Sequence, residues 1–111
     1  MDIQVDELSG GITRALLRGR FDTTGAIAIE LPFNTLAHER AALVVDLSNV
    51  SFMSSYGIRV LLRAAKIATS RDARLVIFCP DSAVSKVLTT AGTGDLIPVF
   101  ATLDAATAAF G

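Results

Sequence analysis

The sequence predicts an α/β fold in which an N-terminal β-hairpin is followed by alternating helices and strands. Two apolar stretches meet at Gly10-Gly11, and paired glycines are typical of a hairpin turn. Mainly apolar runs at 42–47 and 73–78, interrupted only by Asp46 and Arg74, are typical of strands that are buried on both faces. Helical spacings of apolar residues occur between and after these runs. We therefore expect a mixed, mostly parallel sheet with helices mainly on one face.

The N-terminal third supplies the hairpin and a first helix. Residues 3–8 alternate apolar and polar side chains and should pair with a second strand at 12–21. The segment 22–40 opens with Asp22, a good N-cap, and continues in a helical pattern. Pro32 lies in the middle of this segment and should either kink the helix or begin its second half.

The central segment predicts a strand at 42–47, a loop at 48–53 and a helix from Ser55 to about Thr69. In this helix the apolar residues follow one face and the basic residues follow another. The apolar set is Ile58, Leu61, Leu62, Ala65 and Ala68, and the basic set is Arg59, Arg63 and Lys66.

The C-terminal part predicts a strand at 73–78 and a helix that begins at Pro80-Asp81 and ends near the glycines of 91–95. A short edge strand at 96–100 and a last helix at 103–110 follow. The helix after Asp81 carries Val84, Val87 and Leu88. The expected core includes Val44, Val45, Leu47, Ile58, Leu61, Leu62, Val76, Ile77 and Phe78.

Composition and charge exclude several classes of protein. A chain of 111 residues with 51% hydrophobic and 19% charged residues is expected to form a single domain, residues 1–111. A net charge of −1 provides no global field for nucleic acid or anionic lipid. No apolar run approaches the ~20 residues of a membrane span, and the first residues do not resemble a signal peptide. We expect a cytoplasmic protein without direct membrane insertion.

Few residue types for cofactor chemistry are present. The single cysteine, Cys79, follows an apolar run and is interpreted as a small buried hydrophobe. The single histidine, His38, lies among charged residues and should face solvent. A zinc site is not expected from this set, and the sequence predicts no cofactor.

The stretch from Asn49 to Lys66, NVSFMSSYGIRVLLRAAK, places Ser54 and Ser55 where a strand gives way to a helix. Three hypotheses arise: a helix cap, a nucleophile, or a site for a charge-changing modification. The nucleophile hypothesis is weak because G-x-S-x-G is absent and His38 lies upstream of the serines. Neither glycine-rich nucleotide motif is present. A modification site or partner-docking surface is therefore the main functional alternative to a cap.

The chain resembles the STAS family, the domain of bacterial anti-sigma factor antagonists and of sulfate-transporter tails. LVVDLSNVSFMSSYGIRVLL is similar to the family signature D-L-S-x-V-x-F-x-D-S-S-G-L-x-x-L, and LRGRFDTTGA is similar to its L-x-G-x-L-D. The segment from ARLVIF to LIPVF and the ending LDAATAAF are also similar to the family. The resemblance implies the STAS fold and covers nearly the whole chain.

The resemblance also implies a function. In antagonists of this type, a kinase that is also the anti-sigma factor phosphorylates the first serine of D-S-S-G. The unphosphorylated form binds the kinase, and a PP2C-type phosphatase resets the system. In this sequence the acceptor corresponds to Ser55 and the glycine to Gly57, with Ser54 as a second, less favoured acceptor. The implied function is non-enzymatic partner switching in transcription regulation.

Departures from the signature keep a second hypothesis open. The family aspartate is replaced by Ser54, its second serine by Tyr56, and a small residue by Arg59. Some family members are unmodified subunits of larger assemblies, for example a lipid-transport ABC complex. In the family, the loop that here holds Asp22 and Thr23 neighbours the acceptor.

The expected partner-binding residues are Asp22, Thr23, Ser54, Tyr56, Gly57 and Arg59.

Overall fold

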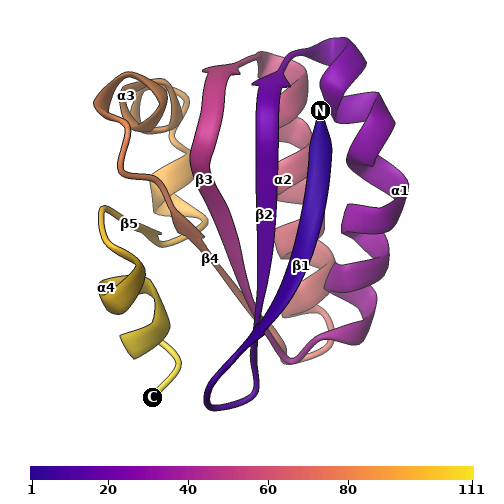
Figure 1. The fold of residues 1–111 in the computed structure, drawn as a ribbon, viewed down its shortest axis with the longest axis vertical. Helices are drawn as coiled ribbons and strands as arrows, with labels where there is room; N and C mark the ends of the chain where they lie inside the picture. Colours follow the sequence, from indigo (N-terminus) through magenta and orange to yellow (C-terminus); the bar gives the residue numbers. More distant parts are fainter.

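The computed structural model describes residues 1–111 as one mixed sheet with flanking helices (Figure 1). In chain order the elements are β1 (Asp2–Leu8), β2 (Ile12–Phe21), α1 (Thr23–Glu39), β3 (Ala42–Met53), α2 (Ser55–Thr69), β4 (Arg74–Phe78), α3 (Ser82–Thr90), the 3₁₀ turn η1 (Thr93–Asp95), β5 (Val99–Phe100) and α4 (Leu103–Ala108). None of the helices combines the length and apolar character that crossing a membrane requires.

The sheet has the order β1-β2-β3-β4-β5. The β1–β2 pair is antiparallel, and each later pair is parallel. The predicted hairpin is confirmed: Gly10 and Gly11 have φ values of 80° and 73°, a conformation that glycine adopts at little cost. Each parallel strand is followed by a helix, and the N-termini of α1, α2 and α3 lie at the same edge of the sheet (Figure 1).

Two unequal hydrophobic layers enclose the sheet. The larger cluster has 25 buried residues and joins the sheet to α1, α2 and α3. The smaller has 4 buried residues and includes Ala106 of α4 on the opposite face. Side chains of alternate strand residues point to opposite faces, so Ala15 and Leu17 enter the larger layer while Ile12 enters the smaller. The expected one-sided arrangement of helices is confirmed.

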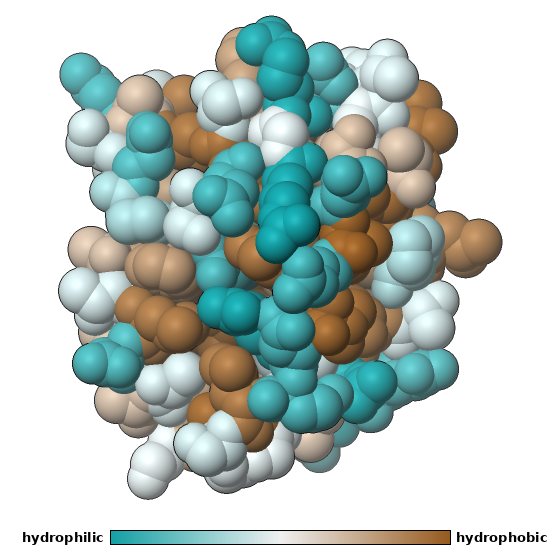
Figure 2. Space-filling view, in the orientation of Figure 1, coloured by the Kyte–Doolittle hydropathy of each residue, from teal (hydrophilic) through white to brown (hydrophobic).

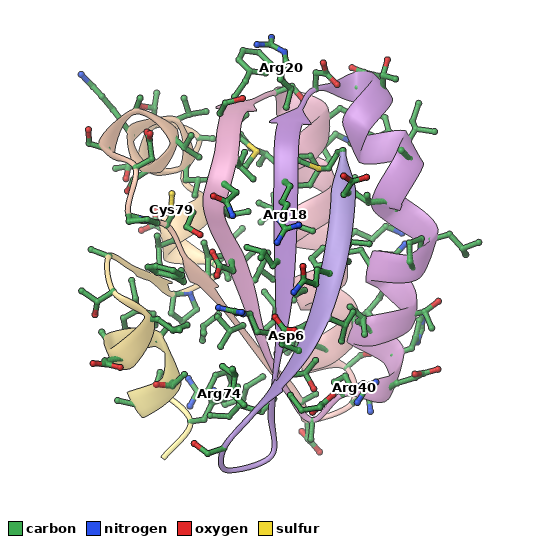
Figure 3. The ribbon with its side chains drawn as sticks, in the orientation of Figure 1. Asp6, Arg18, Arg20, Arg40, Arg74 and Cys79 are labelled. Atoms are coloured by element: carbon green, nitrogen blue, oxygen red, sulfur yellow. The ribbon has the colours of Figure 1, made fainter.

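The face opposite α1 and α2 is mixed in character. Figure 2 shows a hydrophilic band down the middle of this face, with hydrophobic patches on both sides. Arg14 contributes to this side of the sheet and bridges Asp6, at 2.7 Å, and the buried Asp46, at 3.6 Å. Asp6 and Arg18 lie on the same face (Figure 3).

The structure corrects two sequence predictions about the elements. The loop predicted at 48–53 is instead the second half of β3, where Val50 and Met53 are buried. This half pairs with the end of β2 through two register shifts, and its exposed polar residues conceal the strand pattern. Helix α1 runs without interruption through Pro32, so this proline does not begin a new helix.

The predicted core is confirmed except at two positions. Leu62 and Phe78 are only half-buried and pack against the edges of the two clusters. Leu61 is completely buried beside Leu62. In α2 the buried face passes through Gly57, Leu61, Ala64 and Ala68, so Leu62 lies on its border.

Candidate phosphoacceptor and partner-binding site

Ser54 is the N-cap of α2, as the cap hypothesis predicts. Its Oγ accepts a hydrogen bond from the Gly57 amide at 3.0 Å and donates to the Phe21 carbonyl at 2.8 Å. The Ser54 amide donates to the same carbonyl oxygen at 3.0 Å. These bonds join the start of α2 to the end of β2. A serine here performs the capping that an aspartate would also perform.

Ser55 is the first residue of α2 and is exposed. Its hydroxyl makes no hydrogen bond within the chain, in contrast to that of Ser54. The amides of Ser55 and Tyr56 lie in the first turn of α2 and have no intrahelical acceptor. A helix N-terminus also carries a partial positive charge. The environment of Ser55 is therefore favourable for an added anionic group.

Ser55 borders a groove of about 950 Å³ between the start of α2 and α3. The end of β3 contributes Phe52 and Met53, and α2 contributes Ile58 and Arg59. The α3 residues that line the groove are Ala83, Lys86, Val87, Thr90 and Ala91. Sequence reasoning missed this wall because it assigned Val87 to the apolar side of the helix along with Val84 and Leu88. Ala83, Val87 and Ala91, spaced four residues apart, provide the signal for a second apolar stripe.

Tyr56 and Gly57 do not lie in this groove. The Tyr56 hydroxyl is directed toward α1 and lies 3.2 Å from a carboxylate oxygen of Glu30. The Arg59 guanidinium lies 5.9 Å from the Tyr56 ring centroid, so Arg59 borders both the groove and a smaller hollow between α1 and α2. Gly57 is buried against Phe21, and its role in a surface is therefore indirect.

Asp22 and Thr23 lie beside the same edge of the sheet. Asp22 is the N-cap of α1, accepting from the Gly25 amide at 2.8 Å, and Thr23 is exposed. The Arg20 side chain lies 3.6 Å from the Asp22 carboxylate and stacks over Phe52 at 4.4 Å. Figure 3 shows Arg20 at this end of the sheet. Asp22 therefore has a structural task, and Arg20 adds a positive charge near the groove.

The chain has one cysteine and one histidine. Cys79 is buried next to α3 (Figure 3), as predicted, and burial raises the pKa of its thiol. His38 is exposed on α1. No three His, Cys, Asp or Glu side chains lie close enough together to hold a metal ion.

Comparison with known proteins agrees with the fold. The chain is 25% identical to an anti-sigma factor antagonist from Mycobacterium paratuberculosis, with a TM-score of 0.81 over 97% of this chain and 92% of that one. An anti-sigma-factor antagonist (STAS) domain protein from Planctomyces limnophilus is 19% identical, with a TM-score of 0.84 over 98% and 97% of the two chains. The SulP transporter STAS domain from Vibrio cholerae is 26% identical, with a TM-score of 0.66 over 85% and 76%.

No curated protein sequence gives a significant match to the chain. The family model for the STAS domain matches residues 6–106, which include the hairpin turn, Ser54 and Ser55, and the groove between α2 and α3. The chain therefore belongs to the STAS domain family.

Proposed function

We propose that the chain is a protein-binding module of a bacterial partner-switching pathway, controlled by phosphorylation of Ser55. The observation that carries this proposal is that the two neighbouring serines have different hydrogen-bonding environments. Ser54 makes the capping bonds, whereas Ser55 is exposed and has an unoccupied hydroxyl. A modification at Ser55 would therefore leave the bonds between α2 and Phe21 intact.

A phosphate at Ser55 would be tolerated by the helix but not by a docked partner. Free amides in the first turn stabilise the added dianion. The new charge, about −1.5 to −2, would have to be desolvated when a partner covers the groove. A buried and poorly paired charge weakens binding by ~2–5 kcal/mol. Phosphorylation therefore acts as a release signal.

The partners follow from the same proposal. A serine kinase with anti-sigma activity would bind the unmodified chain and phosphorylate it, and a PP2C-type phosphatase would restore binding. The similarity to an anti-sigma factor antagonist at 25% identity supports this assignment. The chain itself would act by binding and not by catalysis.

Mass spectrometry of the protein purified from its own cells tests the acceptor. We expect phosphate on Ser55 and none on Ser54. Calorimetry with the cognate kinase tests the switch: Ser55→Ala should bind at wild-type affinity, Ser55→Asp should bind weakly, and Ser54→Ala should remain a substrate. Phosphate on Ser54 alone, or equal affinity of the wild type and Ser55→Asp, would contradict the proposal.

A second candidate function is that of an unmodified subunit in a larger assembly, such as a lipid-transport ABC complex. Two observations favour it: Ser54 replaces the signature aspartate, and a transporter STAS domain is 26% identical. Its signature in the experiment is the absence of phosphate from Ser55 together with stable co-purification of transporter subunits.

A further inference from the structure

Helix α3 exposes an apolar face that the core does not use. Val84 and Leu88 are its buried residues. Ala83 and Val87 lie one position before these buried residues, and Ala91 is the C-cap of the helix. All three are exposed and line the groove. An apolar stripe on the outside of a helix, facing a groove, is a typical docking surface for another apolar element.

A second groove lies further along α2. Ser55, Arg59, Leu62, Lys66 and Thr69 follow one helical face at spacings of three and four residues. The first two border the α2–α3 groove, and the other three border a second groove of about 700 Å³. Leu96, which is 72% exposed, forms the far side of this second groove. Together the two grooves follow the whole length of α2, about 22 Å for its 15 residues.

The charge along this surface has one sign. The two grooves are bordered by Arg59, Arg63, Lys66 and Lys86, and no acidic residue lines either of them. Because the whole chain has a net charge of −1, these cations are a local concentration and not a general property of the surface. Apolar residues and cations line the same grooves, which indicates an occupant with an apolar stripe and acidic side chains beside it.

We propose that this surface, the α2 groove, binds an acidic amphipathic helix of a partner protein. Such a helix would place its apolar stripe against Ile58, Leu62 and Val87 and its carboxylates beside Arg59 and Lys86. A length of about 22 Å accommodates about four helical turns. The apolar floor distinguishes this surface from one for nucleic acid, whose phosphates need cations but no apolar contact. The inference rests on the proposed function only for its link to Ser55.

That link is the position of Arg59 relative to Ser55. The two residues are four positions apart on the same helical face and border the same groove. A phosphate on Ser55 would pair with Arg59 and so remove a cation from the partner. It would also place negative charge where the acidic helix begins to dock. Both effects release the partner, and neither requires a change of fold.

Binding of a designed peptide to the intact, unphosphorylated protein tests the groove. The probe is a fluorescent helix of about 18 residues with leucines on one face and glutamates on the other, with a leucine–lysine helix as its charge-reversed match. We expect the glutamate peptide to bind at least tenfold more tightly. Arg59→Gln combined with Lys86→Gln should weaken its binding at least tenfold. Arg18→Gln, which removes a cation from the opposite face of the sheet, should leave it unchanged.

Amide chemical shifts measured by NMR should identify the contact, with changes along α2 and the exposed face of α3. Equal binding of both peptides, shifts confined to another face, or preferential binding to vesicles of anionic lipid would overturn the proposal.

The failures of the two proposals are distinguishable. If Ser55 is phosphorylated but the Arg59 and Lys86 variants bind the kinase normally, the groove proposal is refuted and the proposed control by phosphorylation stands. If the protein binds the glutamate peptide selectively but carries no phosphate on Ser55, control by phosphorylation is refuted and the groove proposal stands.

Discussion

Gly57 packs directly against Phe21, and there is no room between them for a side chain. A β-carbon on Gly57 would lie 2.8 Å from the Phe21 carbonyl oxygen and 2.9 Å from its ring. The same carbonyl accepts both hydrogen bonds from Ser54. Close contact at this glycine therefore sets the distance between the start of α2 and the end of β2.

Gly57→Ala should destabilise the fold, because a backbone carbonyl cannot move away as the end of a flexible side chain can. Overpacking of this kind costs about 1–3 kcal/mol. Urea denaturation measures the effect.

Gly94→Ala is the matched control, since a β-carbon added at Gly94 would meet no atom within 4 Å. The urea concentration at which Gly94→Ala is half unfolded should stay close to that of the wild type. A Gly57→Ala variant as stable as Gly94→Ala would refute the steric account.

Leu61→Ala and Leu62→Ala should differ although the residues are neighbours. Leu61 is completely buried on the core-facing side of α2, and its truncation should cost ~2–5 kcal/mol. Leu62 is half-buried at the edge of the α2 groove, so its truncation should cost clearly less. Chemical denaturation of the two variants gives the comparison, and equal losses would contradict the burial assignment.

Arg14→Gln should destabilise the sheet because it removes the cation beside Asp46. This carboxylate is 3% exposed and accepts a hydrogen bond from the Ser48 amide, while Arg14, at 3.6 Å, is its ion-pair partner. Replacing Arg14 therefore leaves the buried carboxylate without a counter-charge. An under-satisfied buried group costs ~1–3 kcal/mol. Arg18→Gln is the control, because Arg18 is exposed on the same face and forms no ion pair. Equal unfolding midpoints for the two variants would exclude the role of Asp46.

Arg14→Gln should also change how the stability of the protein depends on pH. The hydrogen bond from Arg14 is the main cause that lowers the pKa of Asp6, and the hydrogen bond from Gln4 is the second. A carboxyl with a lowered folded-state pKa contributes stability above its unfolded-state pKa, and the contribution is lost as pH falls through the folded-state pKa. The part of the difference between wild type and Arg14→Gln that comes from Asp6 should therefore shrink below about pH 4. An NMR titration should show the pKa of Asp6 rising in the variant.

The order of elements could be predicted from the sequence because it depends on local signals. The Gly10-Gly11 turn, the Asp22 cap and the apolar run at 42–47 each act over a few residues. The second half of β3 could not, since its exposed Ser48 and Asn49 resemble a loop. What holds this half in the sheet is pairing with β2, some thirty residues away in the chain.

The site was predictable in part for the same reason. Ser54, Ser55 and Arg59 lie in one short motif, and the structure brings all three to the groove. The facing wall with Lys86 and Val87 comes from a separate helix, and no local pattern places it opposite Ser55. Tyr56 has the opposite outcome: it belongs to the motif but is directed toward Glu30 and α1.

Negative charge at Ser55 should stabilise the folded protein even though we expect it to weaken partner binding. Ser55 is the first residue of α2, no acidic residue occupies the first turn, and the side chain is exposed. An anionic side chain at a helix N-terminus contributes about 0.3–1 kcal/mol at low ionic strength. Ser55→Asp should therefore be more stable than Ser55→Ala, and Ser55→Lys should be less stable. Urea denaturation at low and high salt measures this order. The differences in stability between the variants should become smaller at high salt, because salt screens the interaction. If Ser55→Asp were less stable than Ser55→Ala at low salt, its loss of partner binding would reflect a damaged helix. Phosphorylation would then act by changing the fold and not by placing charge on the docking surface.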